Sequence, residues 1–237
     1  MKPLISAHRG GAITAGQTAA QRYEHAVTLG ADYVEFDVRK TKDGVSMICH
    51  DDCTVSGRPI RAFAYHDLTE ELGGEALTFD DLLDVVAGRA GLQLDLKETG
   101  YEAEIVNRAL AVSPAALVIT GGDEVVRAVK EQFPRLRAGL SLGDELTGAS
   151  PWKRLRVRLG EILPRRRLER CHADFVAVHH QLAALNVLHY CERHNVPAWV
   201  WTVDEEPAIA RFIADDRVAA LITNRPDVAL KLRSARS

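Results

Sequence analysis

The stretch YVEFDVRKTKDG, Tyr33 to Gly44, reads as a β-strand, yet it carries carboxylates on a face where apolar residues are expected. Side chains alternate between the two faces of a strand, so Glu35 and Asp37 point to the same side. Two ionised carboxylates on a buried face repel each other and lose hydration unless a cation or hydrogen bonds compensate them. The stretch therefore predicts a strand that carries a charged site. The ordinary alternative is that both carboxylates face solvent or pair with Arg39 or Lys40.

Outward from this strand, short apolar runs alternate with longer amphipathic segments along almost the whole chain. The expected strands are Leu4–Ala7, Tyr33–Arg39, Gly91–Lys97, Leu117–Thr120, Ala138–Leu142, Phe175–Val178, Ala198–Val203 and Ala219–Thr223. The expected helices are Thr18–Leu29, Thr78–Val86, Tyr101–Val112, Asp123–Phe133, Gln181–His194, Glu205–Ala214 and Pro226–Leu232. Strands separated by helices predict an α/β fold with a parallel sheet, and eight strands are the number that closes a TIM (β/α)8 barrel.

A doubly wound sheet is the competing fold. It requires a glycine-rich phosphate loop after its first strand, and HRGGAITAG matches neither the dinucleotide-binding nor the P-loop pattern. Residues Cys49–Ala76 do not follow the alternation and predict a small insertion after the second strand, on the side of a barrel where insertions shape the site. No Pro/Ser-rich linker or short repeat divides the chain, so residues 1–237 are expected to form one barrel domain.

Composition places the chain among soluble globular proteins, with 46% hydrophobic and 27% charged residues. A formal net charge of -3 gives no case for nucleic-acid binding. No apolar run approaches the roughly 20 residues that cross a bilayer, and the N-terminus becomes polar too early for a secretory signal, so a cytoplasmic protein is expected. The cysteines suggest no disulfide framework. Cys49 and Cys53 flank His50 in CHDDC, but no second pair of ligands is spaced to complete a zinc site.

Residues able to carry chemistry gather at the ends of the first three expected strands, where barrel enzymes place their sites. They are His8 and Arg9 after the first strand, Glu35 and Asp37 on the second, His50 and Asp51 after the following turn, and Asp95 and Lys97 on the third. Three carboxylates from two adjacent strands suit a hard cation with oxygen ligands, Mg²⁺ or Ca²⁺. Together with two histidines and two fixed positive charges, they form a set suited to phosphoryl transfer.

The strings AHRGG, GADYVEFDVRKTKDGVSMICHDD, LQLDLKE, AWVWTVDEE and ALITNRPDVAL together resemble the glycerophosphodiester phosphodiesterase family, in the family's order, from His8 to Leu230. The resemblance implies a TIM barrel and metal-dependent cleavage of glycerophosphodiesters to sn-glycerol 3-phosphate and an alcohol. It implies these roles: His8 and His50 as catalytic residues, Arg9 and Lys97 as phosphate contacts, and Glu35, Asp37 and Asp95 as metal ligands. Trp201 corresponds to an aromatic beside the substrate, although a barrel-filling aromatic explains it equally well.

The chain departs from the family pattern at two positions. Many members read E-N-T after HRG, whereas this chain reads Gly16-Gln17-Thr18, so a glutamate near the metal is replaced by glycine. Asp95 is one methylene shorter than the glutamate that many relatives carry. Water or Gln17 is expected to fill the vacated ligand position.

The segment from Ser150 to Cys171 is basic, with eight Lys/Arg against two Glu, and apolar residues lie between the charges. Such a mixture is typical either of a solvated, irregular connection or of an element that rests on anionic lipid as a peripheral membrane contact. Membrane contact would favour lysophospholipids as substrates and a lysophospholipase D activity. A second alternative is a non-catalytic barrel that binds a phosphodiester without cleaving it. A third, a hydrolase of another barrel family, would usually show a His-x-His pair where this chain has His8-Arg9.

Overall fold

The computed structural model describes residues 2–74, 76–143, 152, 160–161 and 164–236. Within these residues, eight parallel strands form a ring that closes through the pairing of the first two strands of the chain. The strands of the ring are β1 (Leu4–Ala7), β2 (Tyr33–Lys40), β4 (Gly91–Leu96), β5 (Leu117–Gly121), β6 (Arg137–Leu142), β7 (Phe175–His179), β8 (Ala198–Trp201) and β9 (Val218–Thr223). The predicted (β/α)8 barrel is confirmed, and the doubly wound alternative is wrong because the sheet has no open edge between β1 and β2.

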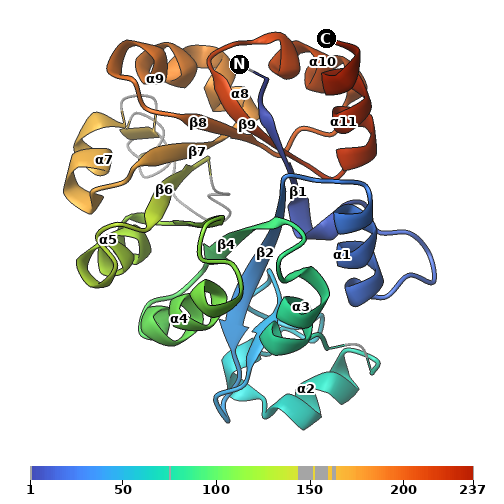
Figure 1. Ribbon diagram of the computed structural model, residues 1–237. Coiled ribbons are helices and arrows are strands. Elements are labelled where there is room, and N and C mark those ends of the chain that lie inside the picture. The colour runs from blue at the N-terminus through green and yellow to red at the C-terminus, as the bar shows by residue number, and fades with distance from the viewer. Residues whose placement is uncertain (1, 75, 144–151, 153–159, 162–163, 237) are drawn as a thin grey trace.

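Helices surround the ring and cover its outer face (Figure 1). The main ones are α1 (Ala19–Thr28), α3 (Phe79–Val86), α4 (Glu102–Val112), α5 (Asp123–Gln132), α7 (Arg165–Cys171), α9 (Leu188–His194), α10 (Glu206–Ala214) and α11 (Pro226–Ala235). A short α8 (His180–Leu182) and a π-helical turn η3 (Ala183–Val187) precede α9 and complete the predicted 181–194 helix. The apolar sides of these helices and the outward-facing strand residues form the main core.

Helix ends follow the expected local chemistry. Thr18 begins α1 with a reciprocal capping box in which its side chain accepts from the Gln21 N–H and the Gln21 side chain accepts from the Thr18 N–H. Thr78 and Asp81 form the same arrangement at the start of α3. These caps satisfy donors that a helix start otherwise leaves unpaired, so both helices begin where the sequence predicted.

Aromatic side chains fill the lower part of the barrel interior. The ring of Trp199 packs against those of Tyr33 and Phe175, with centroids 5.1 and 5.0 Å apart. Gly139 makes room for this layer, because a Cβ at that position would lie 2.2 Å from the Phe175 ring. The interior is therefore filled at the N-terminal ends of the strands, and a pocket opens toward their C-terminal ends.

The predicted insertion after the second strand is present and has internal order. It contains β3 (Ser46–Ile48), which pairs antiparallel with β2, followed by η2 (Ile60–Ala62) and α2 (Tyr65–Glu71). The insertion has a small hydrophobic core of its own, formed by Met47, Ile60, Phe63 and Leu68. Figure 1 shows α2 set apart from the helices that cover the ring. The turn between β2 and β3 reverses the chain, so His50 returns toward the mouth of the barrel.

Candidate active site

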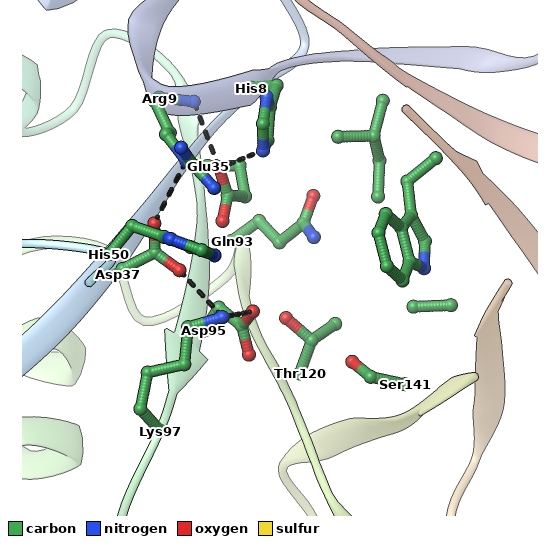
Figure 2. A pocket seen from close by; sticks show the side chains of 13 residues that line it. His8, Arg9, Glu35, Asp37, His50, Gln93, Asp95, Lys97, Thr120 and Ser141 are labelled. Carbon is green, nitrogen blue, oxygen red and sulfur yellow. Dashed lines mark hydrogen bonds and ion pairs between the residues drawn. The ribbon is translucent and has the colours of Figure 1, made fainter. Parts of the chain in front are cut away.

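A pocket opens at the C-terminal ends of the barrel strands, and every residue to which the family resemblance gave a catalytic, phosphate, substrate or metal role lines it (Figure 2). The lining residues are His8, Arg9, Glu35, Asp37, His50, Gln93, Asp95, Lys97, Thr120, Ser141, Ala177, Trp201 and Ile222. They lie on the seven strands of the ring other than β1, directly after β1 and β4, and in the loop after β3. The barrel thus gathers residues as far apart in the sequence as His8 and Ile222.

The acidic cluster consists of Glu35 and Asp37 on β2 and Asp95 on β4. These strands pair in parallel with Asp37 directly opposite Asp95, and carboxylate oxygens of all three residues lie within 4.8 Å of one another. Glu35 and Asp37 are only 3% and 2% exposed. The alternative in which both face solvent or pair with the next basic residues is wrong, because Arg39 pairs with Glu98 and Lys40 with Glu104.

Two cations stand beside these carboxylates. The Lys97 Nζ lies 2.9 Å from Asp37 Oδ1 and 2.6 Å from Asp95 Oδ2. Burial alone would lower the pKa of Lys97, but Asp95 and Asp37 outweigh it and raise that pKa, so the ammonium stays charged. The Arg9 Nε lies 3.3 Å from Asp37 Oδ2, yet this buried nitrogen has no hydrogen-bond partner among the described residues. The Arg9 side chain as a whole is 40% exposed, so its guanidinium can still meet an incoming anion.

The backbone at Arg9 adopts a left-handed conformation, with φ of 50°, inside the short helix η1 (His8–Gly10). A non-glycine residue in this region is unusual and costs conformational energy, and such residues cluster at functional sites. The turn aims the Arg9 N–H at Glu35, whose Oε2 accepts at 2.9 Å. Gly10 continues the turn with φ of 78°, where a Cβ would lie 3.0 Å from the Tyr23 backbone nitrogen. The absence of a side chain at Gly10 thus lets this turn pack closely against α1, with Arg9 turned into the pocket.

The acidic cluster fits a divalent cation. Burial, followed by the neighbouring charges of Asp37 and Asp95, raises the pKa of Glu35 well above its ordinary range. A cation bound among the three carboxylates would offset their mutual repulsion and favour the ionised form of Glu35. An all-oxygen set of this kind is what Mg²⁺ and Ca²⁺ prefer. Within the described residues this is the one cluster of possible metal ligands, so the CHDDC reading gains no support.

The two histidines differ in their surroundings. The His8 Nδ1 lies 2.9 Å from Asn224 Oδ1, and its Nε2 lies 3.9 Å from Glu35 Oε2. Burial, and then the nearby charge of Arg9, lowers the pKa of His8. The His50 side chain is 42% exposed, and its Nδ1 lies 2.8 Å from Asp51 Oδ1. The hydrogen bond from His50 in turn lowers the pKa of Asp51.

Arg39 has a structural role in holding His50 at the pocket. Its guanidinium donates from Nε and Nη2 to the His50 carbonyl oxygen, at 3.0 and 2.9 Å. The Cys49 N–H donates to the carbonyl of Asp37 at 3.1 Å. The loop after β3 is therefore tied to β2 on both sides of His50.

The remaining wall of the pocket is uncharged, and sequence reasoning missed most of it. Gln93 lies two residues before Asp95 and so shares its face of β4, while Thr120 on β5 is paired in register with Asp95. Thr120 is 1% exposed, and its hydroxyl has no hydrogen-bond partner among the residues the structure describes. The sequence did carry a signal for these residues: Gln93 and Thr120 are polar residues inside apolar strands, near the positions of the carboxylates.

Residues 8–113 match the model of the glycerophosphoryl diester phosphodiesterase family. A glycerophosphodiester phosphodiesterase of Caldanaerobacter subterraneus subsp. tengcongensis is 24% identical over 255 residues, covering 98% of each chain. The crystal structure of a glycerophosphodiester phosphodiesterase from Parabacteroides distasonis has a TM-score of 0.77 at 20% identity, covering 99% of this chain and 98% of that chain. A phosphodiesterase of Oleispira antarctica, solved with the product sn-glycerol-3-phosphate, has a TM-score of 0.74 at 19% identity, covering 98% of this chain and 97% of that chain.

The comparisons support the family resemblance that the sequence motifs indicated, and the family model matches the first part of the chain. The matched segment includes both histidines of the pocket and the entire acidic cluster. The similarity to solved structures extends over the rest of the chain and identifies the shared barrel. The family resemblance read from the sequence is therefore confirmed.

The structure places Gln17 away from the position that the sequence analysis offered for it. Gln17 lines a separate hollow with Thr14, Arg22 and His25, between α1 and the start of α11, and is not among the described residues that line the acidic pocket. The structure therefore gives no support to the prediction that the Gln17 side chain fills a ligand position. Water remains as the candidate for that position.

The predicted membrane contact through residues 150–171 lies largely outside the described residues. The structure describes Trp152, Gly160, Glu161 and residues 164–171 of that segment, and the last of these form α7. The sequence predicted no helix there, because only Leu168 and Cys171 of α7 are buried. Among the described residues, no helix has both the length and the apolar character needed to span a bilayer. Peripheral membrane contact stays a prediction.

Proposed function

We propose that this protein is a metal-dependent phosphodiesterase that hydrolyses glycerophosphodiesters to sn-glycerol 3-phosphate and an alcohol. The observation that carries the proposal is the meeting of three carboxylates, two histidines and two fixed cations in one pocket at the C-terminal mouth of the barrel. Each group serves a different need of phosphodiester cleavage, and the family resemblance supports the same reaction. The related Oleispira antarctica enzyme was solved with sn-glycerol-3-phosphate, the product expected here.

Glu35, Asp37 and Asp95 would hold the divalent cation, Mg²⁺ or Ca²⁺. When bound, the cation would act as a Lewis acid toward the phosphate and neutralise part of its charge. The residues themselves are arranged for this before any ligand arrives, since β2 and β4 place all three carboxylates on one side of the pocket. Their burial keeps the local dielectric low, which strengthens their attraction for a cation.

Arg9 and Lys97 would bind the non-bridging phosphate oxygens. Lys97 reaches the pocket from the end of β4, and the left-handed turn at Arg9 brings the guanidinium to the opposite side of Asp37. Negative charge that builds on these oxygens in the transition state is stabilised by donors already in position. Binding at the phosphate therefore also lowers the barrier to its cleavage.

His8 and His50 would move the protons. Phosphodiester cleavage requires that one proton leave the attacking hydroxyl and that another reach the departing alcohol. The two imidazoles approach the pocket from different elements, His8 from the end of β1 and His50 from the loop after β3. This arrangement suits one histidine for each proton transfer.

The surroundings of Lys97 favour a polar leaving group. A groove adjoins the pocket at Lys97, and the described residues along it are mostly charged: Arg61, Glu98, Asp123, Glu124, Arg127 and Arg170. An acyl chain would have to lie against these groups and displace their water, at a cost that a small polar headgroup avoids. Deacylated glycerophosphodiesters therefore fit better than lysophospholipids.

The decisive experiment is a product assay with purified protein, glycerophosphocholine and Mg²⁺ or Ca²⁺, in which sn-glycerol 3-phosphate is measured. We expect turnover that His8→Ala and His50→Ala each reduce by about 10²- to 10⁴-fold. His66→Ala is the matched control, because the His66 side chain is 84% exposed and outside the pocket. Faster release from lysophosphatidylcholine would favour the lysophospholipase D alternative. Tight binding without product, with either cation, would favour a non-catalytic barrel.

A further inference from the structure

A chain of hydrogen bonds runs along the rim of the barrel behind His8. It begins at Asp204, after β8, passes through Asn224, after β9, and ends at the His8 ring, after β1. Asn224 Nδ2 donates to Asp204 Oδ2 at 2.8 Å, and Asn224 Oδ1 lies 2.9 Å from His8 Nδ1. These three strands are neighbours in the ring, so its closure brings together residues as far apart as positions 8 and 224.

Asp204 is the fixed end of this chain. Its Oδ1 accepts from the backbone N–H of Asn224 at 2.8 Å and from the Thr223 hydroxyl at 3.3 Å. The Thr223 hydroxyl oxygen itself accepts from the Arg225 N–H at 2.9 Å, which leaves its proton for Asp204. One oxygen of Asp204 is therefore engaged by the backbone of the β9–α11 loop, and the other faces the amide of Asn224.

The direction of each hydrogen bond follows from this anchor. An ionised carboxylate only accepts, so the Asn224 atom that faces Asp204 must be the amino group. The atom that faces His8 is then the carbonyl oxygen, which also only accepts. His8 must donate to it, and its proton lies on Nδ1. The unprotonated Nε2 is left on the opposite edge of the ring, toward Glu35 and the pocket (Figure 2).

We propose that Asp204 and Asn224 are positioning residues that hold His8 in the tautomer with its proton on Nδ1, so that Nε2 meets the substrate as a proton acceptor. This inference rests on the proposed function for its consequence in catalysis. The Nδ1 of His50 faces the carboxylate of its own neighbour, Asp51, which also only accepts, so the same reasoning places the His50 proton on Nδ1. The two histidines differ in what holds that proton: a chain of two side chains at His8, and one exposed carboxylate at His50.

The test uses Asp204→Asn, Asn224→Asp and the double variant that exchanges the two. In Asp204→Asn, the remaining oxygen stays with the Asn224 backbone N–H, so the new amino group faces the Asn224 side chain. Asn224 must turn over, its amino group faces His8 Nδ1, and the His8 proton moves to Nε2. In the double variant, the carboxylate at position 224 accepts both from the amide at position 204 and from His8 Nδ1–H. The exchange restores the original tautomer.

Proton–nitrogen correlation spectra of the imidazole ring report the tautomer without any turnover. The His8 signal is assigned by its loss in His8→Ala. We expect protonated Nδ1 in the wild type and in the double variant, and protonated Nε2 in Asp204→Asn. Asp215→Asn is the matched control, since Asp215 pairs with Arg217 before β9, at the other end of the barrel, and should leave the spectrum unchanged.

Kinetics with glycerophosphocholine give the second readout. We expect Asp204→Asn to lower kcat by about 10- to 100-fold with KM unchanged, because the tautomer matters only for proton transfer. The double variant should recover to within about threefold of the wild type, a coupling that a merely structural role would not produce. The proposal is overturned if the His8 tautomer is unchanged in Asp204→Asn. It is also overturned if the kcat of the double variant is no higher than that of Asp204→Asn. If the wild type releases no product, the proposed function fails, while the spectra still decide the tautomer.

Discussion

The pocket has two unlike walls. Its charged residues lie on or directly after three neighbouring strands of the ring, β1, β2 and β4, and in the loop after β3. The other five strands, β5 to β9, each contribute one uncharged residue: Thr120, Ser141, Ala177, Trp201 and Ile222. Figure 2 shows this division, with ion pairs on one side and hydroxyl groups on the other.

This asymmetry matches the two parts of the proposed substrate. A phosphodiester carries its charge at one point, and its glycerol carries only hydroxyl groups. The charged wall supplies strong electrostatic stabilisation at the phosphate, where charge builds during the reaction. The uncharged wall offers hydrogen bonds and contact area, which contribute to binding in ground state and transition state alike. Changes on the charged wall should therefore lower kcat, and changes on the uncharged wall should raise KM.

The largest effect is expected for Glu35→Gln on the charged wall. The substitution keeps the shape and an oxygen for the Arg9 N–H, which Glu35 accepts at 2.9 Å, but removes one of the three negative charges. Loss of several kcal/mol of metal-mediated stabilisation corresponds to about a 10³-fold lower kcat/KM. Activity measured over a Mg²⁺ titration, with circular dichroism to check the fold, tests this. Full activity of the variant at the Mg²⁺ concentration that saturates the wild type would show that Glu35 is not a metal ligand.

Lys97→Gln should have the next largest effect. The ammonium group sits between Asp37 and Asp95 and is proposed to face the phosphate, so its loss should lower kcat by about 10²-fold. Lys130→Gln is a control of the same chemistry, since Lys130 pairs with Asp174 away from the pocket. Steady-state kinetics at saturating Mg²⁺ distinguish the two variants. Equal kcat values for both would show that Lys97 serves only to pair the carboxylates.

How far the sequence predicts this site depends on the kind of residue. Glu35, Asp37 and Asp95 stand out because a carboxylate inside an apolar strand has few structural explanations. Thr120 and Ser141 do not, since hydroxyl residues are common in strands. Asp204 and Asn224 escape sequence reasoning because their link to His8 depends on ring closure. The same contrast holds for the fold: long periodic helices such as α1 and α5 were predicted, whereas the three-residue β3 has too little pattern to show.

On the uncharged wall, Thr120→Val should separate stability from binding. The Thr120 hydroxyl is buried and without a partner among the described residues, so replacing it by a methyl group should stabilise the ligand-free protein by about 1 kcal/mol. This corresponds to a Tm increase of about 2–4 °C. If the hydroxyl serves the glycerol moiety, KM should rise by about 3- to 10-fold with kcat unchanged, because a net hydrogen bond contributes about 1 kcal/mol. A higher Tm with unchanged KM would show that the Thr120 hydroxyl does not bind the substrate.

The smallest effect is expected for Trp201→Phe, which decides between substrate contact and barrel filling. Trp201 is half-buried at the pocket, and its ring meets that of His179 edge to face at a centroid distance of 5.3 Å. Phenylalanine keeps an aromatic face but loses area and the indole N–H. If Trp201 contacts the substrate, KM should rise by about threefold while Tm changes little, since aromatic contacts contribute about 0.5–1.5 kcal/mol. If the ring only fills the barrel, Tm should fall and KM should stay the same. Trp199→Phe supplies the reference for pure filling, because Trp199 is 1% exposed among Tyr33 and Phe175, below the pocket.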